Sequence, residues 1–187
     1  MRDAGWVAAA CLAIVGCGGG NEELPSSLAV APTCEQIYEN GHPLACASSD
    51  PVVLSREDEL TALTNEYRIS LGMDALVDDP ALRKLARAHC EHMILHGFFA
   101  HVNPEGDWPW DRATLAGIEW ADFAENLAAG QETARQAFWQ LLSSPEHRRT
   151  IEDSAWTHLG CGYAKDATAP YVHYWAQNFK RSKTESR

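Results

Sequence analysis

The spacing of apolar residues predicts a first helix between Ser55 and Gly72. Four large apolar side chains recur there at intervals of three or four residues, which places them on one helical face: Leu60, Leu63, Tyr67 and Leu71. Ser55 and Asp58 resemble a capping box at the start of this segment, and Gly72 is suited to end it. The preceding residues, up to about Asp50-Pro51, lack this periodicity and are expected to form a linker.

Two pairs of a capping residue and a proline predict further helix starts. Asp79-Pro80 places a side-chain acceptor before a proline at the first helical position, and the helical pattern then continues to Gly97. Ser144-Pro145 repeats this signal ahead of a short helix. Residues 133–142, between these two segments, have the spacing of another helix with one apolar face.

The C-terminal part of the chain has the pattern of strands. Residues 158–164 and 171–179 are strand-like runs, and the residues between them, 166–170, are typical of a turn. The helices come first along the chain and these strands come late. This order favours an α+β sandwich over alternating βαβ units.

The N-terminus has the pattern of a secretory signal. Arg2 precedes an apolar run from Trp6 to Gly16, which is too short to cross a bilayer as a helix. The run closes on Ile14-Val15-Gly16-Cys17, which resembles the lipobox of bacterial lipoproteins, where the cysteine is acylated and becomes the mature N-terminus. We therefore predict a signal peptide over 1–16 and lipidation of Cys17. An ordinary secretory signal with an incidental cysteine is the alternative.

The segments around the folded part follow from composition. Residues 17–54 are rich in proline, serine, alanine and glycine, and we interpret them as a tether followed by a small disulfide-pinned segment. One folded domain is expected over 55–181, with a tail over 182–187. A lipid on Cys17 would anchor this domain outside the cytoplasm, at a bacterial outer membrane or cell surface.

The cysteines suit an oxidising compartment. Of six, one leaves with the signal peptide and one would carry the lipid, so four remain and allow three pairings. We favour Cys34–Cys46, which closes a local loop, and Cys90–Cys161, which would tie a helix to a strand.

Charge and missing motifs exclude several classes of protein. With 15 Lys+Arg against 26 Asp+Glu, the chain has a formal charge of −11, which argues against binding to nucleic acid. A single apolar stretch excludes a multi-span membrane protein. The chain contains no G-x-S-x-G, H-E-x-x-H, P-loop or EF-hand sequence, so no familiar catalytic signature identifies it as an enzyme.

Three histidines of the second predicted helix lie on one face: His89, His92 and His96. That spacing alone could surround a metal ion. Packing explains them better, because His89 lies within the apolar stripe and is expected in the core. His92 and His96 flank the stripe and can be solvated.

Several short motifs, read together, resemble a known family. They are Asn65-x-x-Arg68, Phe98-Phe99-Ala100-His101, Pro109-Trp110-Asp111-Arg112, Glu125-Asn126-Leu127-Ala128, Ser144-Pro145-Glu146-His147-Arg148, Leu159-Gly160-Cys161-Gly162 and the run 174–179. Their order and spacing resemble the CAP superfamily (cysteine-rich secretory proteins, antigen 5 and plant pathogenesis-related 1), in its short bacterial form. The resemblance covers about residues 57–180 and marks 55–181 as a CAP (SCP) domain.

The resemblance implies a three-layer α-β-α sandwich with a cleft lined by histidine and glutamate. The family motifs place His101, Glu125 and His147 in this cleft. Larger eukaryotic members carry another glutamate, three residues after a helical tryptophan. This chain has Leu142 at that position, so the fourth member of the set is absent.

Two imidazoles and a carboxylate that face one cavity can bind Zn²⁺ or another divalent metal with a coordination position left open. Without a metal, Glu125 can fix the tautomer of a histidine, and the trio is then a hydrogen-bonded polar cluster. Both interpretations stay open. Catalysis is the weaker expectation, because no activated nucleophile or companion acid is evident.

The sequence therefore predicts a membrane-anchored binding module of the cell envelope. Its partners are expected to be the membrane, through the N-terminal lipid, and a lipid, peptide or cell-wall component in the cleft. A zinc-dependent hydrolase using the same cleft and a structural envelope protein without a ligand are the alternatives.

Overall fold

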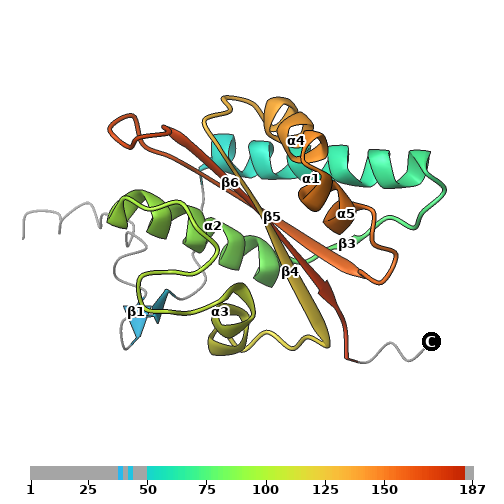
Figure 1. Cartoon of the computed structure of the whole chain (residues 1–187), viewed down its shortest axis with the longest axis horizontal. Coiled ribbons are helices and arrows are strands. Elements are labelled where there is room, and N and C mark those ends of the chain that lie inside the picture. The colour runs from blue at the N-terminus through green and yellow to red at the C-terminus, as the bar shows by residue number, and fades with distance from the viewer. Residues whose placement is uncertain (1–37, 40–41, 44–49, 184–187) are drawn as a thin grey trace, which may run out of the picture. The chain divides into compact units, whose positions relative to one another are not determined.

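A computed structural model describes residues 38–39, 42–43 and 50–183 (Figure 1). The predicted signal peptide, Cys17 and the Cys34–Cys46 pair lie outside these residues, and so does most of the predicted tether. Within it, β1 (Tyr38–Glu39) pairs with β2 (His42–Pro43) in a short antiparallel ladder.

The first long helix, α1 (Pro51–Ser70), begins four residues earlier than predicted. Its N-cap is Asp50, whose carboxylate accepts a hydrogen bond from the Val52 amide at 2.8 Å, and Pro51 occupies the first helical position. The predicted cap, Ser55, lies inside the helix. Asp50-Pro51 is the same signal that predicts two other helices in this chain, so local chemistry also encodes this start.

The other predicted helices are confirmed. Helix α2 (Pro80–His96) is capped by Asp79 and ends at Gly97, whose left-handed backbone conformation (φ 66°) suits glycine. Helix α4 (Ala134–Ser143) lies where the apolar spacing predicts it, and α5 (Pro145–Ile151) begins after the predicted cap, Ser144. Within 50–183, no helix is long and apolar enough to span a bilayer.

The second half of the chain supplies most of a four-stranded sheet. Its strands are β3 (Val77–Asp78), β4 (Asp122–Ala129), β5 (His158–Lys165) and β6 (His173–Arg181), in the order β3-β5-β6-β4. Only the β3–β5 pair is parallel. The strand predictions near 158–164 and 171–179 are confirmed, whereas β3, β4 and the short helix α3 (Pro109–Leu115) were not predicted.

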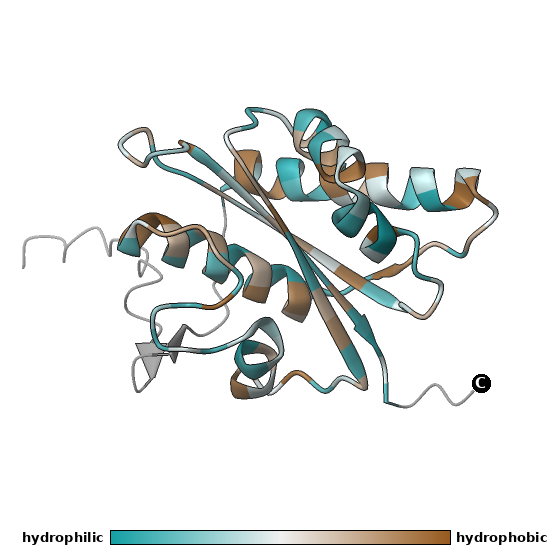
Figure 2. Cartoon of the chain, in the orientation of Figure 1, coloured by the Kyte–Doolittle hydropathy of each residue, from teal (hydrophilic) through white to brown (hydrophobic). Residues whose placement is uncertain are grey.

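Helices cover both faces of this sheet, so the predicted α-β-α sandwich is confirmed (Figure 1). Helices α1 and α4 contribute to a core on one face, around the fully buried Trp175 and Phe179. Helix α2 contributes to a separate core on the other face, around Met93 and Tyr174. Hydrophobic and hydrophilic residues alternate along the helices, as expected where one side of a helix is buried (Figure 2).

Two glycines of β5 set how closely α2 approaches the sheet. A Cβ atom at Gly160 would lie 2.2 Å from the backbone nitrogen of Arg83, and one at Gly162 would lie 2.2 Å from that of Arg87. Both neighbours are helix backbone and cannot move aside alone. The Leu-Gly-Cys-Gly motif therefore presents a flat strand surface on which the helix backbone rests.

The predicted Cys90–Cys161 disulfide does not form, and both cysteines are buried free thiols. Successive side chains of a strand point to opposite faces, so Cys161 points away from the face on which Gly160 and Gly162 meet α2. Cys161 belongs to the core beside α1, and Cys90, on α2, belongs to the core of the opposite face. The sheet thus separates the two sulfurs.

A buried ion pair joins the helices of the two faces where β3 stops. Glu57 of α1 and Arg87 of α2 form a two-pronged pair, with Arg87 Nε 2.7 Å from Glu57 Oε1. The same oxygen accepts a hydrogen bond from the Tyr163 amide of β5 at 3.1 Å. Strand β3 pairs only with His158 and Leu159 of β5, so it does not reach the Tyr163 amide further along that edge. Glu57 accepts the hydrogen bond of this amide instead.

Candidate functional site

His101 and Glu125 form the centre of the candidate site. His101 lies in the loop between α2 and α3, and Glu125 lies on β4; His101 Nδ1 is 2.9 Å from Glu125 Oε1. The glutamate side chain is 1% exposed and the histidine side chain 44%. An ionised carboxylate only accepts hydrogen bonds, so Nδ1 carries the proton and donates it. Nε2 of His101 keeps its lone pair for a ligand.

Arg112 holds the other oxygen of the same carboxylate. From α3 its Nη2 donates to Glu125 Oε2 at 2.8 Å, and its Nη1 donates to the backbone carbonyls of His101 (2.6 Å) and Asp107 (3.1 Å). The Arg112 and Glu125 side chains are each only 1% exposed. This arginine therefore fixes both the carboxylate and the loop that carries His101.

These neighbours decide the charge of Glu125. Burial by itself raises the carboxyl pKa, but the Arg112 guanidinium, His89 and the hydrogen bond from His101 outweigh it and lower the pKa from 4.5 to about 2. The group is an anion across the physiological range. A carboxylate held in this way is suited to orient His101 rather than to exchange protons with a substrate.

His89 lies behind this pair and is fully buried, as predicted for a core residue. Its Nε2 donates to the carbonyl of Ala100 at 2.9 Å and is 3.9 Å from Glu125 Oε1. Burial lowers the His89 pKa from 6.5 to about 4, so the ring is neutral at pH 7. The prediction that His92 can be solvated is wrong, since it too is fully buried, whereas His96 is exposed.

His147 is placed by the first turn of α5 and is half-buried. Burial lowers its pKa, and repulsion from the His101 ring, when that ring is protonated, lowers the pKa further, so the two imidazoles are within electrostatic reach of one another. Asn126, next to Glu125 on β4, donates from Nδ2 to the His147 carbonyl at 3.1 Å and to Gln177 Oε1 at 3.2 Å. The Glu-Asn motif thus anchors His101 with one residue and α5 with the next.

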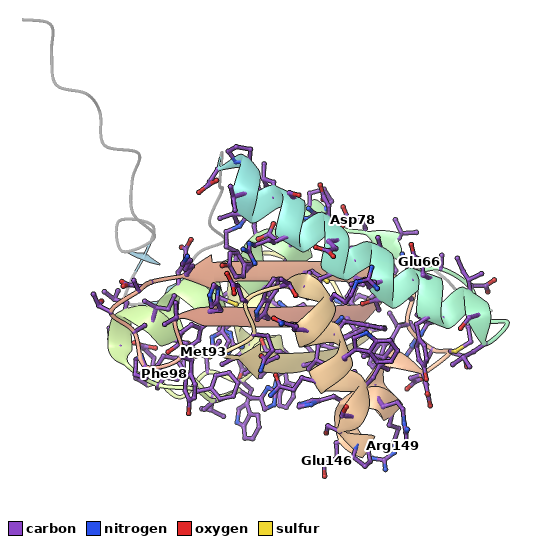
Figure 3. The ribbon with its side chains drawn as sticks, turned by 90° about the horizontal axis from the view of Figure 1, so that it is seen from above. Glu66, Asp78, Met93, Phe98, Glu146 and Arg149 are labelled. Carbon is purple, nitrogen blue, oxygen red and sulfur yellow. The ribbon has the colours of Figure 1, made fainter. Side chains whose placement is uncertain are left out.

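The position of the missing fourth member is apolar. Leu142 is buried in the core beside α4 and offers no polar atom to the site. Glu146, which neighbours His147 in sequence, is exposed, and its label in Figure 3 marks an outward-pointing side chain. The site therefore contains two histidines, one carboxylate and the arginine that binds it.

Arg112 and Asn126 lie within the family motifs, but the motifs alone predict no role for them. Each is buried and hydrogen-bonded to the site, at 1% exposure. The sequence offered no local signal for their burial, because Arg112 directly follows Asp111 and Asn126 directly follows Glu125. The identity of that partner depends on chain segments that only the fold brings close.

The site contains atoms that could bind a metal ion, but they are not already gathered around one point. A metal ion needs several ligand atoms close together. Among residues 50–183, one group of three His, Cys, Asp or Glu residues has ligand atoms that all lie within 4.8 Å of one another, and it consists of His92, His96 and Glu105. The trio of His101, Glu125 and His147 is not such a group, so its three sets of ligand atoms do not all come within 4.8 Å of one another, although His101 and Glu125 are in contact. A metal ion held by His101 and His147 would therefore need the two rings to move closer together or a further donor from a ligand.

Comparison with known proteins identifies similar chains. The model of the cysteine-rich secretory protein family (CAP) matches residues 61–179. The uncharacterised protein YkwD of Bacillus subtilis is 31% identical over 132 residues, or 71% of this chain. The alignment covers 49% of YkwD, so this chain spans about half the length of that relative.

Solved structures show the same fold. An extracellular protein with an SCP domain from Bacillus anthracis superposes with a TM-score of 0.65 at 24% identity, over 73% of this chain and 45% of that one. An outer surface protein of Borrelia burgdorferi superposes with a TM-score of 0.64 at 18% identity, over 75% of this chain and 100% of that one.

Proposed function

Because the chain belongs to the cysteine-rich secretory protein (CAP) family, we propose that it is an extracytoplasmic binding module whose His101 and His147 hold a divalent metal ion. The main support for this proposal is the hydrogen bond from His101 Nδ1 to Glu125, which leaves Nε2 available to a metal. A histidine backed by a carboxylate in this way is a common arrangement at zinc sites.

The donor set fits zinc in three respects. The His101 side chain is 44% exposed, so a metal can reach it from solvent. Burial lowers the pKa of His147, which favours the neutral imidazole that ligation requires. The two histidines leave coordination positions for water or for a donor group of a bound ligand, and zinc would there act as a Lewis acid toward that group.

The state of Glu125 favours binding over hydrolysis. A general base works best with a pKa near the working pH, whereas the pKa of Glu125 is about 2 and its oxygens are taken by His101 and Arg112. We therefore prefer a metal-dependent binding module of the cell envelope to a zinc hydrolase.

The location is part of the same proposal. The N-terminal sequence resembles the signal peptide and lipobox of a secreted lipoprotein. The structural neighbours described above are, by their titles, an extracellular and an outer surface protein. A lipid on Cys17 would tether the domain to the membrane, where the site meets a lipid, peptide or cell-wall component.

Zinc titration by calorimetry tests the metal site. We expect saturable binding by the wild-type chain and a loss of this binding step in the double variant His101→Ala/His147→Ala. Glu125→Gln should weaken it by about 10–100-fold, as removal of a supporting partner usually does. The matched control His158→Ala, on β5, should titrate like the wild type. A double variant with an unchanged isotherm would refute the proposal.

A further inference from the structure

A second group of ligand atoms lies at the C-terminal end of α2. His92 and His96 are one helical turn apart, and Glu105 approaches them from the loop between α2 and α3. The ligand atoms of all three lie within 4.8 Å of one another, and His92 Nε2 is 3.5 Å from Glu105 Oε1. The His92 and His96 rings meet edge to face, with centroids 4.4 Å apart.

These distances fit a metal ion without a large rearrangement. Zinc binds imidazole nitrogen at about 2.0 Å and carboxylate oxygen at about 2.1 Å, so neighbouring ligand atoms of a tetrahedral site are about 3.3 Å apart. The 3.5 Å between His92 and Glu105 is close to this edge length. Two imidazoles and one carboxylate are also a donor set that zinc uses, with a fourth position left for water.

The loop holds Glu105 in place before any metal binds. Asn103 and Asp107 bracket it through reciprocal hydrogen bonds: the Asp107 amide donates to Asn103 Oδ1 at 2.6 Å, and Asn103 Nδ2 donates to Asp107 Oδ2 at 3.0 Å. The Gly106 amide donates to the Asn103 carbonyl at 3.0 Å. Glu105 therefore sits on a closed turn, which reduces the ordering cost of ligation.

Burial and charge around the group also suit a cation. His92 is fully buried against Phe98, which is labelled in Figure 3, whereas His96 and Glu105 are exposed and leave a path from solvent. His92 interacts electrostatically with Glu105 and Asp107, which are acidic, and with His96 and Arg112, which are basic. The nearby carboxylates offset the single permanent positive charge of Arg112.

We propose that His92, His96 and Glu105 form a second zinc site that clamps the α2–α3 loop onto the end of α2. Glu105 follows His101 by four residues on the same loop. Zinc at this position would stabilise the segment that presents His101 while sharing no ligand with it. The proposal does not depend on metal binding at His101 and His147.

Cobalt(II) can report on this site separately, because tetrahedral Co²⁺ with nitrogen and oxygen ligands has an intense visible absorption. The full chain and its His101→Ala/His147→Ala variant are titrated with Co²⁺, and Zn²⁺ is then added in competition. The ligand variants are His96→Ala and Glu105→Gln, both of exposed residues whose replacement leaves the core intact. His158→Ala and Glu119→Gln are the matched controls.

The expected result is a tetrahedral spectrum that survives in His101→Ala/His147→Ala and in both controls. Affinity should fall at least about tenfold in His96→Ala and in Glu105→Gln, since each removes a ligand rather than a supporting partner. Zinc should also slow amide hydrogen exchange over 98–108 in the wild type but not in Glu105→Gln. Equal affinity in wild type and Glu105→Gln would overturn the proposal. A spectrum lost only in His101→Ala/His147→Ala would overturn it too.

Discussion

Replacing Glu125 with glutamine tests how the site is held together. The substitution keeps the shape of the side chain but removes the charge that Arg112 and His101 share. The Arg112 guanidinium would then be a buried cation with no carboxylate partner, since its side chain is 1% exposed. Breaking a buried pair in this way is among the costly single changes in proteins.

The lowered pKa of Glu125 sets the size of the effect. A fall from 4.5 to about 2 corresponds to about 3 kcal/mol of stability in the ionised state. Because the folded-state pKa is the lower one, this stability is present in full above the unfolded pKa of 4.5. It is lost as the pH falls from there toward 2. The free energy of unfolding of the wild type should therefore exceed that of Glu125→Gln by about 3 kcal/mol at pH 7 and by about 2 kcal/mol at about pH 3.5.

Urea unfolding followed by tryptophan fluorescence measures this difference. Wild type and Glu125→Gln are compared at pH 7, 5 and 3.5, with Glu119→Gln as a control for the loss of an exposed carboxylate. The control should lie within about 0.5 kcal/mol of the wild type at every pH. A difference for Glu125→Gln below about 1 kcal/mol at pH 7, or one that does not shrink with acid, would refute the electrostatic account.

Two further predictions concern the packing of β5. Gly162→Ala should destabilise the fold by about 3 kcal/mol or more, because the added Cβ would lie 2.2 Å from the Arg87 backbone nitrogen. Urea unfolding would measure this loss of stability, and a loss below about 1 kcal/mol would contradict the close approach of helix and strand. Cys90 and Cys161 should both resist alkylation in the native protein and both react after denaturation without reductant, as mass spectrometry would show; a thiol pair that stays blocked in urea would instead indicate a disulfide.

Local signals account for what could be predicted of the fold. The starts of α2 and α5 follow from a capping side chain before a proline, since the atoms that interact lie within one turn of each other. The same signal occurs at Asp50-Pro51, and Asp50 caps α1, so the predicted start at Ser55 is wrong. Strand β4 escaped prediction because its burial does not alternate: three successive residues, Asn126 to Ala128, are all buried.

The family motifs proposed His101, Glu125 and His147 as one site, but they did not reveal how the charges around Glu125 are arranged. The hydrogen bond between His101 and Glu125 spans 24 residues, and Arg112 reaches Glu125 from α3, an element that was not predicted. The burial of His92 was missed for a related reason. A helical pattern shows which face is apolar, but a loop, here the one starting at Phe98, covers the flank of that face.

The amino-acid sequence by itself determined the family, the helix starts at Asp79 and Ser144 and the two C-terminal strands. Only the tertiary structure decided that Arg112 holds Glu125 as an anion and that a sheet separates Cys90 from Cys161. Caps and apolar spacing act between neighbours along the chain. Charge state and thiol pairing depend on which distant segments packing brings within a few ångströms.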